Sequence, residues 1–264
     1  MINPINVGEL REKVRSATPF PFFAIDNFLD PVFARQVYDS FPSFQDAMKV
    51  GVTFKTVNEK QKIQITDSTK FAPHVFELNR LLAAPEWTGI LSEAFDIPNL
   101  LSDDKLVGGG MHQTGSRGRL DVHVDFNYIA ERQLHRRLNV LVYLNPVWQA
   151  EWGGNLELWD RKVERCDHSF QPLFNRCVAF ETSDISYHGV TAVNCPPEHA
   201  RRSFATYYYT KEPPSHWKGE SHDTIFRSRP DEVVRGRVLM PAERAARFAQ
   251  QSVQKLKRGI RRMF

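Results

Sequence analysis

The sequence has few cysteines and no long apolar run, and each shortage excludes a class of protein. Its three cysteines, Cys166, Cys177 and Cys195, are widely spaced and form neither a CxxC pair nor a disulfide framework. We therefore expect reduced thiols. No run of about 18 apolar residues is present, so no transmembrane helix is predicted. The opening residues, MINPINVGELREKVRS, lack the apolar stretch of a secretory signal, which favours a cytoplasmic protein.

Basic charge is scarce outside the C-terminal end. The net charge of the 264 residues is +4. The segment 231–264 holds nine basic and three acidic side chains, a net +6, so residues 1–230 carry a net −2. A large phosphate-binding face on the body is therefore not expected, and neither is a nucleic-acid partner.

The basic segment 231–264 returns to helical spacing from Ala242 onward. The apolar residues that can share one helical face there are Phe248, Val253, Leu256, Ile260 and Met263. A basic amphipathic helix suits an anionic membrane surface or an acidic partner. The same pattern also fits a terminal helix packed on the body or against another subunit. Peripheral membrane attachment and oligomer formation both stay open.

Helical patterns dominate the first 105 residues. Asp30 followed by Pro31 is typical of a helix N-cap with proline at the first helical position. The segment 75–95 has apolar residues at helical spacing and predicts two helices broken near Pro85. Residues 50–66 alternate loosely and predict strands or a mobile flap.

Short alternating segments separated by Gly, Pro and Asn begin at about Leu106. We predict strands over 120–126, 138–144, 155–159, 176–180 and 203–209. Several short strands with turn residues between them favour a β-sandwich or barrel. The expected fold class is mainly β with α. One domain spans 1–230, with a helical part over 1–105 and a β core over 106–212, and a C-terminal helix follows over 231–264.

A candidate metal site begins in the alternating segment DVHVDF, residues 121–126. On a strand His123 and Asp125 would point the same way, about 7 Å apart. Alone this pattern also fits a solvated strand face or a His–Asp hydrogen bond. His188 follows a strand-like segment 63 residues later and supplies a third ligand. Two histidines and one carboxylate form the facial triad of non-haem Fe(II) oxygenases, although Mn²⁺, Co²⁺ or Ni²⁺ fit the same ligands. No HExxH zinc motif is present.

Four motifs in sequence order resemble the prolyl 4-hydroxylase-like branch of the Fe(II)- and 2-oxoglutarate-dependent oxygenases. They are GGGMHQTGSRGRLDVHVDFNY, RLNVLVYLNPVWQAEWGGNLELWD, CVAFETSDISYHGVTAV and RRSFATYYYT, and they span roughly residues 106–212. The resemblance implies a double-stranded β-helix (jelly roll) with N-terminal helices packed outside it. It also implies Fe(II), 2-oxoglutarate as cosubstrate, O₂, and ascorbate as a candidate reductant.

The resemblance further implies a basic residue for the distal carboxylate of 2-oxoglutarate. Arg201 and Arg202 compete for this role. Alternation favours Arg201, because it shares a strand face with the small Ser203 and leaves space for a ligand. Its RxS pattern also resembles that of the family. Tyr143, in the Tyr-Leu-Asn sequence, is expected to donate to a cosubstrate carboxylate, and Gln113 is a weaker candidate for a pocket polar group.

The implied reaction is oxidative decarboxylation of 2-oxoglutarate to succinate and CO₂, coupled to hydroxylation of an unactivated C–H bond. The carboxylate of Asp125 favours hydroxylation over halogenation, because halogenating relatives lack it. The substrate is not encoded in a motif; a small molecule or glycan is favoured slightly over peptidyl proline. The rival functions are a non-catalytic jelly-roll binding module and a membrane-recruited partner protein that acts through its basic tail.

Overall fold

The computed structural model describes residues 1–215, 217–243 and 245. Most of the predicted C-terminal helix over 231–264, including its apolar positions Phe248 to Met263, lies outside the described residues. The part of that segment within them contains a short π-helical turn, η3 (Arg235–Leu239). Within the described part of the chain, no helix has both the length and the apolar character needed to cross a membrane.

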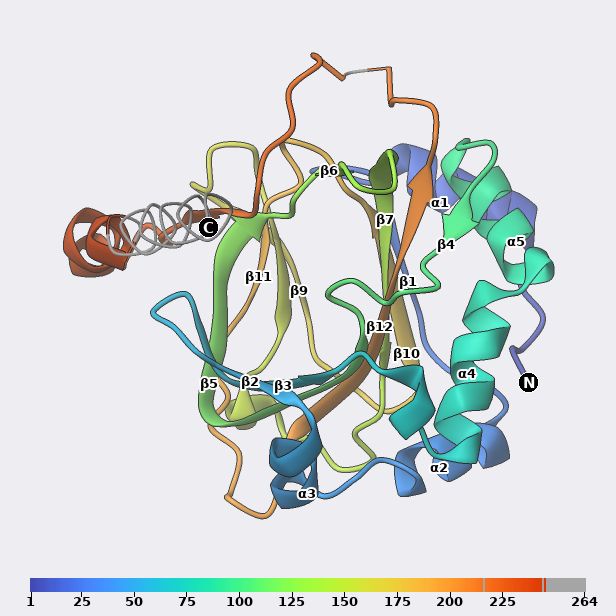
Figure 1. Cartoon of the computed structure of the whole chain (residues 1–264), viewed down its shortest axis with the longest axis horizontal. Helices are drawn as coiled ribbons and strands as arrows, with labels where there is room; N and C mark the ends of the chain where they lie inside the picture. Colours follow the sequence, from blue (N-terminus) through green and yellow to red (C-terminus); the bar gives the residue numbers. More distant parts are fainter. Residues whose placement is uncertain (216, 244, 246–264) are drawn as a thin grey trace, which may run out of the picture.

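The strands of the described residues form one curled antiparallel sheet. They are β1 (Phe22–Ile25), β2 (Val52–Lys55), β3 (Glu59–Ile65), β4 (Leu101–Ser102), β5 (Gly110–Val124), β6 (Tyr128–Ile129), β7 (Leu134–Tyr143), β8 (Leu156–Trp159), β9 (Cys166–Phe170), β10 (Arg176–Glu181), β11 (His188–Val190), β12 (Arg201–Thr210) and β13 (Ile225–Arg227). The main path runs β1-β10-β7-β12-β5-β11-β8-β9. Figure 1 shows β10, β7 and β12 in one layer and β11 and β9 in a facing layer. The predicted jelly roll is confirmed.

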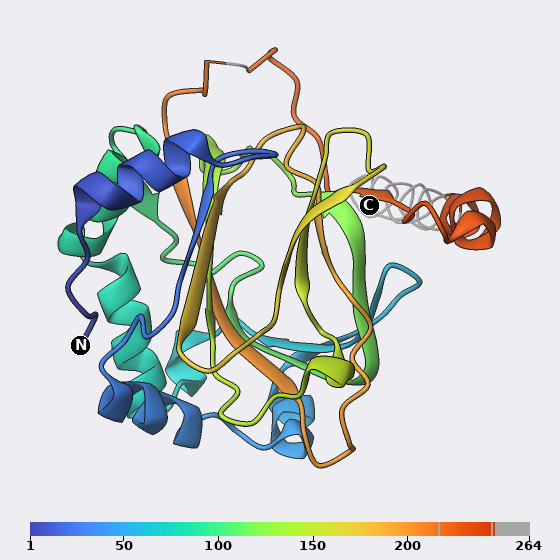
Figure 2. The ribbon, with the colours of Figure 1, turned by 180° about the vertical axis from the view of Figure 1, so that it is seen from behind.

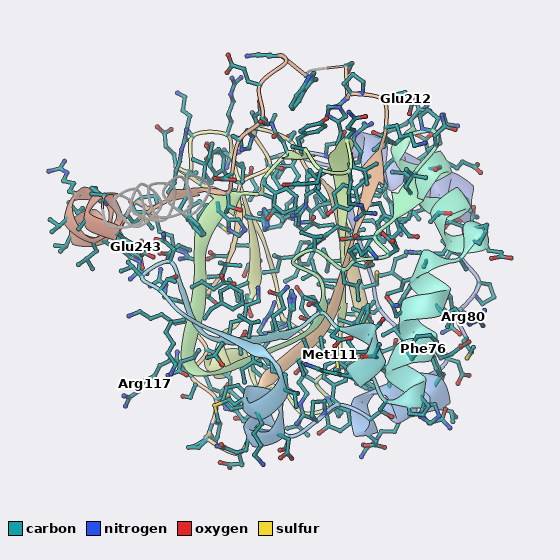
Figure 3. The ribbon with its side chains drawn as sticks, viewed as in Figure 1. Phe76, Arg80, Met111, Arg117, Glu212 and Glu243 are labelled. Atoms are coloured by element: carbon teal, nitrogen blue, oxygen red, sulfur yellow. The ribbon has the colours of Figure 1, made fainter. Side chains whose placement is uncertain are left out.

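The long strand β5 belongs to both layers. Its first half pairs with β12, and its last residues pair with β11 and β13. The strand bends near Arg117, whose φ of 65° lies in the left-handed region, and Figure 3 shows this side chain pointing away from the body. Gly118 is required at the bend, because a Cβ there would come within 2.3 Å of Thr114 Cγ2. The bend delivers the end of β5 to the facing layer.

Helices cover one face of the sheet. They are α1 (Val7–Ser16), α2 (Pro31–Asp39), α3 (Phe44–Val50), α4 (Pro73–Ala83) and α5 (Pro85–Phe95), with short 3-10 turns η1 (Ser68–Lys70) and η2 (Ala150–Trp152). Figures 1 and 2 show α1, α2, α4 and α5 packed outside the layer that contains β7 and β10. The break at Pro85 and the Asp30 cap, whose side chain accepts from the backbone of Val32 and Phe33, are as predicted.

The helices hold the sheet through one shared core. On β7, Leu138, Val140 and Val142 face this core. Phe76 and Arg80 lie on the outer side of α4, where Phe76 is 49% exposed (Figure 3). The hydroxyl of Tyr208 on β12 accepts a hydrogen bond from Trp87 Nε1 at 3.0 Å and donates to the Leu82 carbonyl at 2.6 Å. These bonds tie β12, which carries Arg201, to α4 and α5.

Candidate metal and cosubstrate site

Three potential metal ligands meet at the junction of β5 and β11. His123 and His188 are direct partners in the register of the two strands, and Asp125 follows the end of β5. Their ligand atoms all lie within 4.8 Å of one another. Each Nε2 is 3.5 Å from an oxygen of Asp125. Strand pairing thus brings together His123 and His188, which are 65 positions apart in the sequence.

Backbone carbonyls fix the tautomer of both histidines. His123 Nδ1 lies 2.8 Å from the Asp121 carbonyl, and His188 Nδ1 lies 3.0 Å from the Ser186 carbonyl. A carbonyl can only accept, so each Nδ1 carries the proton and each Nε2 presents a lone pair. Burial, with the neighbouring His123 ring, lowers the pKa of His188 to about 3, which keeps this imidazole neutral. Neutral imidazole is the form that binds a metal.

Two side chains of β7 hold the carboxylate of Asp125. Asn139 Nδ2 donates to Asp125 Oδ2 at 2.7 Å, and the Arg136 guanidinium lies 3.1 Å from the same oxygen. Burial alone would raise the pKa of Asp125, but Arg136, His188 and His123 together outweigh burial and hold the pKa well below the usual range. The carboxylate is therefore anionic and oriented, as a metal ligand must be. Two imidazoles and one carboxylate fit Fe(II).

A cavity of about 210 Å³ extends from these ligands into the jelly roll. Apolar side chains on facing strands form part of its wall: Leu141, Leu156, Phe180 and Val190. Polar and charged groups converge among them, which is typical of a site for a small polar ligand.

Arg201 projects into this cavity from the start of β12. Its side chain is held by two hydrogen bonds: Nε donates to the Gly154 carbonyl at 2.6 Å, and Nη2 donates to the Tyr143 hydroxyl at 3.2 Å. The residue is only 4% exposed. Among the described residues, no acidic side chain forms an ion pair with it. A buried guanidinium without a carboxylate partner is costly unless a ligand supplies the anion.

The other predicted cosubstrate residues fall in different places. Arg202 points to the outer face of β12, where its guanidinium lies 5.0 Å from the ring centroid of Tyr38, and it does not line the cavity. Tyr143 is fully buried behind Arg201 and contacts it. Gln113 is not brought to the cavity; its side chain donates to the Pro42 carbonyl at 2.8 Å.

Several cavity residues were not predicted. His112, next to Gln113, faces the cavity, and burial holds its pKa well below the usual value. Alternation places Ser203 on the face of Arg201, but the register that sets His112 opposite Ser203 comes from the pairing of β5 with β12. Arg136 and Asn139 had no motif. The charged residues Glu59 and Lys62 reach the cavity from the β2–β3 hairpin, which the sequence identified only as strands or a flap.

The strand β13 closes another side of the cavity. It pairs with the end of β5, with Phe226 directly opposite His123. The two rings are 5.3 Å apart between centroids, and Phe226 and Thr224 line the cavity. The sequence had no strand prediction for this segment. A chain segment far downstream of the triad thus packs against one of the potential metal ligands.

An ion-pair cluster fastens the segment that follows β13. Its centre is Asp121, which is 0% exposed and lies 2.7 Å from both Arg119 and Arg235. Arg235 also donates to the backbone carbonyl of Val57. Arg229 pairs with Glu157 on β8 at 2.7 Å. We call these residues, together with Glu232, which pairs with Arg119 at 2.6 Å, the C-terminal clasp.

The chain matches a known family over part of its length. Residues 109–210 match the model of the 2OG-Fe(II) oxygenase superfamily, the segment that holds the triad, Tyr143 and Arg201. This segment is less than half of the chain, and over it the chain is similar to the superfamily. Prolyl 3-hydroxylase OGFOD1 of Mus musculus is 33% identical over 78 residues, which cover 28% of this chain and only 14% of that protein.

Solved structures share the fold at low sequence identity. A prolyl hydroxylase of Trichoplax adhaerens, in complex with a peptide fragment of a hypoxia inducible factor, matches with a TM-score of 0.56 and 18% identity, over 77% of this chain and 88% of that one. A Pseudomonas putida prolyl-4-hydroxylase matches with a TM-score of 0.52 and 14% identity, over 76% and 98%. The non-heme epimerase SnoN of nogalamycin biosynthesis matches with a TM-score of 0.51 and 12% identity, over 85% and 94%.

Proposed function

We propose that the chain is an Fe(II)- and 2-oxoglutarate-dependent dioxygenase that hydroxylates an unactivated C–H bond of an organic substrate, releasing succinate and CO₂. The observation that carries this proposal is Arg201, a buried cation without an acidic partner among the described residues, in the same cavity as the triad. A dicarboxylate cosubstrate supplies the missing anion. The match of residues 109–210 to the superfamily model supports the same chemistry.

Each group has a separate task in this proposal. His123, Asp125 and His188 would hold Fe(II), while Arg201 would bind the distal carboxylate of 2-oxoglutarate as a charge-assisted pair. Tyr143 orients Arg201 through its hydroxyl, 3.2 Å away. When bound, iron and 2-oxoglutarate supply the oxidising chemistry; the protein contributes orientation and an apolar wall that excludes water.

The decisive test measures succinate formation by anaerobically purified protein given Fe(II), 2-oxoglutarate, ascorbate and O₂. We expect substrate-free turnover in the wild type and in Arg202→Gln, and its loss in His123→Ala. Incorporation of ¹⁸O from labelled O₂ into an organic product would separate hydroxylation from epimerisation, the reaction named for SnoN.

The competing function is a jelly-roll binding module without catalysis. The convergent triad and the unmatched charge of Arg201 argue against it, because a module without metal has no need of either. If the Mn(II)-loaded protein failed to bind 2-oxoglutarate and the Fe(II)-loaded protein formed no succinate, the binding module would be the better conclusion.

The class of substrate is a more specific proposal than the reaction. A small molecule or glycan and peptidyl proline are the two candidates, and the solved complex of the Trichoplax adhaerens enzyme with a peptide supports the second. Recruitment by an anionic membrane or an acidic partner through the basic tail stays a prediction, to be tested by comparing the location of the full-length chain with that of a chain that lacks residues 242–264.

A further inference from the structure

A pair of charged side chains on β3 lines the cavity without contacting the triad or Arg201. In a regular strand, Glu59 and Lys62 would point to opposite faces, because they are three positions apart. The register with β5 shifts between Lys60 and Lys62, and Gln61 has a φ of 50° in the left-handed region. This β-bulge turns Glu59 and Lys62 to the same side, and both reach the cavity.

Stability does not account for this arrangement. A left-handed backbone at a residue with a side chain costs about 1 kcal/mol. The Lys62 ammonium and the Glu59 carboxylate lie 2.7 Å apart, and the two side chains are 15% and 16% exposed. An ion pair removed from water in this way adds little net stability. Bulges occur next to functional sites, where they re-aim side chains, so the bulge and the pair point to recognition.

Lys62 retains hydrogen-bonding capacity for a ligand. An ammonium has three N–H donors, and one of them is directed to Glu59 Oε1. No second hydrogen bond of this ammonium forms among the described residues; it lies 5.3 Å from the ring centroid of Phe54. Burial by itself would lower the pKa of Lys62, but the interactions with Glu59 and Tyr207 together outweigh burial. The net effect is a raised pKa, so the ammonium is charged. Two donors therefore remain.

The charge of the whole cavity favours an anion. Its lining contains four cationic side chains and two carboxylates, namely Lys62, Arg119, Arg136, Arg201, Glu59 and Asp125. Arg119 is already paired with Asp121 and Glu232 of the clasp, which leaves three cations against two carboxylates. A ferrous ion and the 2-oxoglutarate dianion would cancel each other in charge. An excess of positive charge therefore remains when both are bound, which attracts an anionic substrate and repels a cationic one.

We propose that Lys62, held in place by Glu59, is a substrate-binding residue that donates hydrogen bonds to a carboxylate or phosphate group of a small organic substrate. This inference rests on the proposed function and names the substrate class of the same site. Phe54 and Phe226 also line the cavity and offer apolar contact to the carbon skeleton of such a molecule. A neutral peptide would leave the two free donors of Lys62 without an anionic partner.

The test uses probes in matched pairs: N-acetyl-L-proline with N-acetyl-L-prolinamide, and glucose 6-phosphate with glucose. Succinate formation is measured with each probe. We expect at least one anionic member to raise the rate above the substrate-free level while its neutral partner does not, and the two pairs distinguish a carboxylate from a phosphate. Lys62→Gln should raise the KM for that probe about tenfold to a hundredfold, the effect of losing one charge-assisted hydrogen bond.

Two further variants complete the design. Lys62→Arg keeps the charge and should keep the preference for the anionic probe. Lys60→Gln removes an exposed lysine on the same strand and should leave the KM unchanged. Equal stimulation by neutral probes, no stimulation by any anionic probe, or an unchanged KM in Lys62→Gln would overturn the proposal. If Lys62→Gln does not fold, Lys62→Arg and the wild-type comparison of paired probes still decide.

Failure of the proposed function has a different signature. In that case no succinate forms with or without a probe, and the Mn(II)-loaded protein does not bind 2-oxoglutarate. Substrate-free succinate formation without a preference for anions overturns only the role of Lys62.

Discussion

A single guanidinium is expected to set the affinity for the cosubstrate. Arg201→Gln removes the cation that would pair with the distal carboxylate but preserves much of the side-chain volume. The lost charge-assisted hydrogen bonds, about 1.5–3 kcal/mol, correspond to a rise of about 10- to 150-fold in the KM for 2-oxoglutarate. The rate of succinate formation against 2-oxoglutarate concentration measures this.

Arg202→Gln is the matched control for that substitution. It removes the same charge one position along β12, from a side chain that lies over Tyr38 on the outer face. Its KM should equal that of the wild type. An equal rise of the KM in both variants would mean that the net charge of the protein, and not the position of Arg201 in the cavity, governs cosubstrate binding.

The hydrogen bond from Asn139 to Asp125 is expected to strengthen metal binding. Asn139→Ala removes the hydrogen bond of 2.7 Å to Oδ2 and leaves Arg136 alone to orient the carboxylate. Loss of such an outer partner typically lowers metal affinity about 10- to 100-fold. Titration of Mn(II), followed by electron paramagnetic resonance, measures the effect. The exposed Asn194→Ala should bind Mn(II) as the wild type does.

Among single residues, the sequence motifs predicted the three metal ligands but not the side chains that tertiary structure brings next to them. The HxD pattern and the distal His188 are local signals, and the structure brings all three side chains together. Arg136 and Asn139 reach Asp125 only because β7 lies inside the jelly roll, and no local pattern records that. Gln113, a weaker candidate for a pocket polar group, does not line the cavity, whereas its neighbour His112 does.

The C-terminal clasp is expected to stabilise the β13 segment. Arg235→Gln removes two hydrogen bonds to the buried carboxylate of Asp121, while Arg119 stays beside it. A buried polar group that loses a partner costs about 1–3 kcal/mol, so the free energy of unfolding should fall by about that much. Urea denaturation measures it. Arg237→Gln, on the exposed side of η3, should stay within about 0.5 kcal/mol of the wild type.

The clasp substitution also has a consequence at the triad. The backbone carbonyl of Asp121 accepts a hydrogen bond from Nδ1 of His123, and Phe226 packs against the His123 ring. Arg235→Gln should therefore weaken Mn(II) binding as well as folding. Normal Mn(II) affinity in a destabilised Arg235→Gln protein would show that the clasp supports the fold alone.

At the element scale, length and periodicity decided which segments could be predicted. The predicted strand 138–144 lies on β7 (Leu134–Tyr143) and 203–209 lies within β12 (Arg201–Thr210), because both have several alternating apolar residues. β13 has three residues, too few for a periodic signal, and forms only because β5 offers an open edge. The bulge at Gln61 is likewise a product of pairing with β5.

For the whole molecule, composition predicted a mainly β domain but not how its charges are used. Arg235 belongs to the segment 231–264 that gives the chain its positive charge, and Arg229 lies just before it, yet both pair with buried acids of the jelly roll. Net charge counted along the sequence cannot reveal such pairing, because the acidic partners lie more than 70 positions upstream. The predicted surface role of the basic region therefore concerns the residues that follow this clasp.

Metal binding should stabilise the folded chain, because the three metal ligands come together only when β5 and β11 are paired. A ligand that binds only the folded state at a hundred times its Kd stabilises by about 2.7 kcal/mol, which for a chain of this size raises Tm by about 5–10 °C. Calorimetry with Mn(II) should show this rise, and a chelator should reverse it. Asp125→Ala should lose the rise while still unfolding cooperatively. A rise that persists in Asp125→Ala would place the metal elsewhere, whereas a wild-type Tm indifferent to Mn(II) would contradict the triad as a metal site.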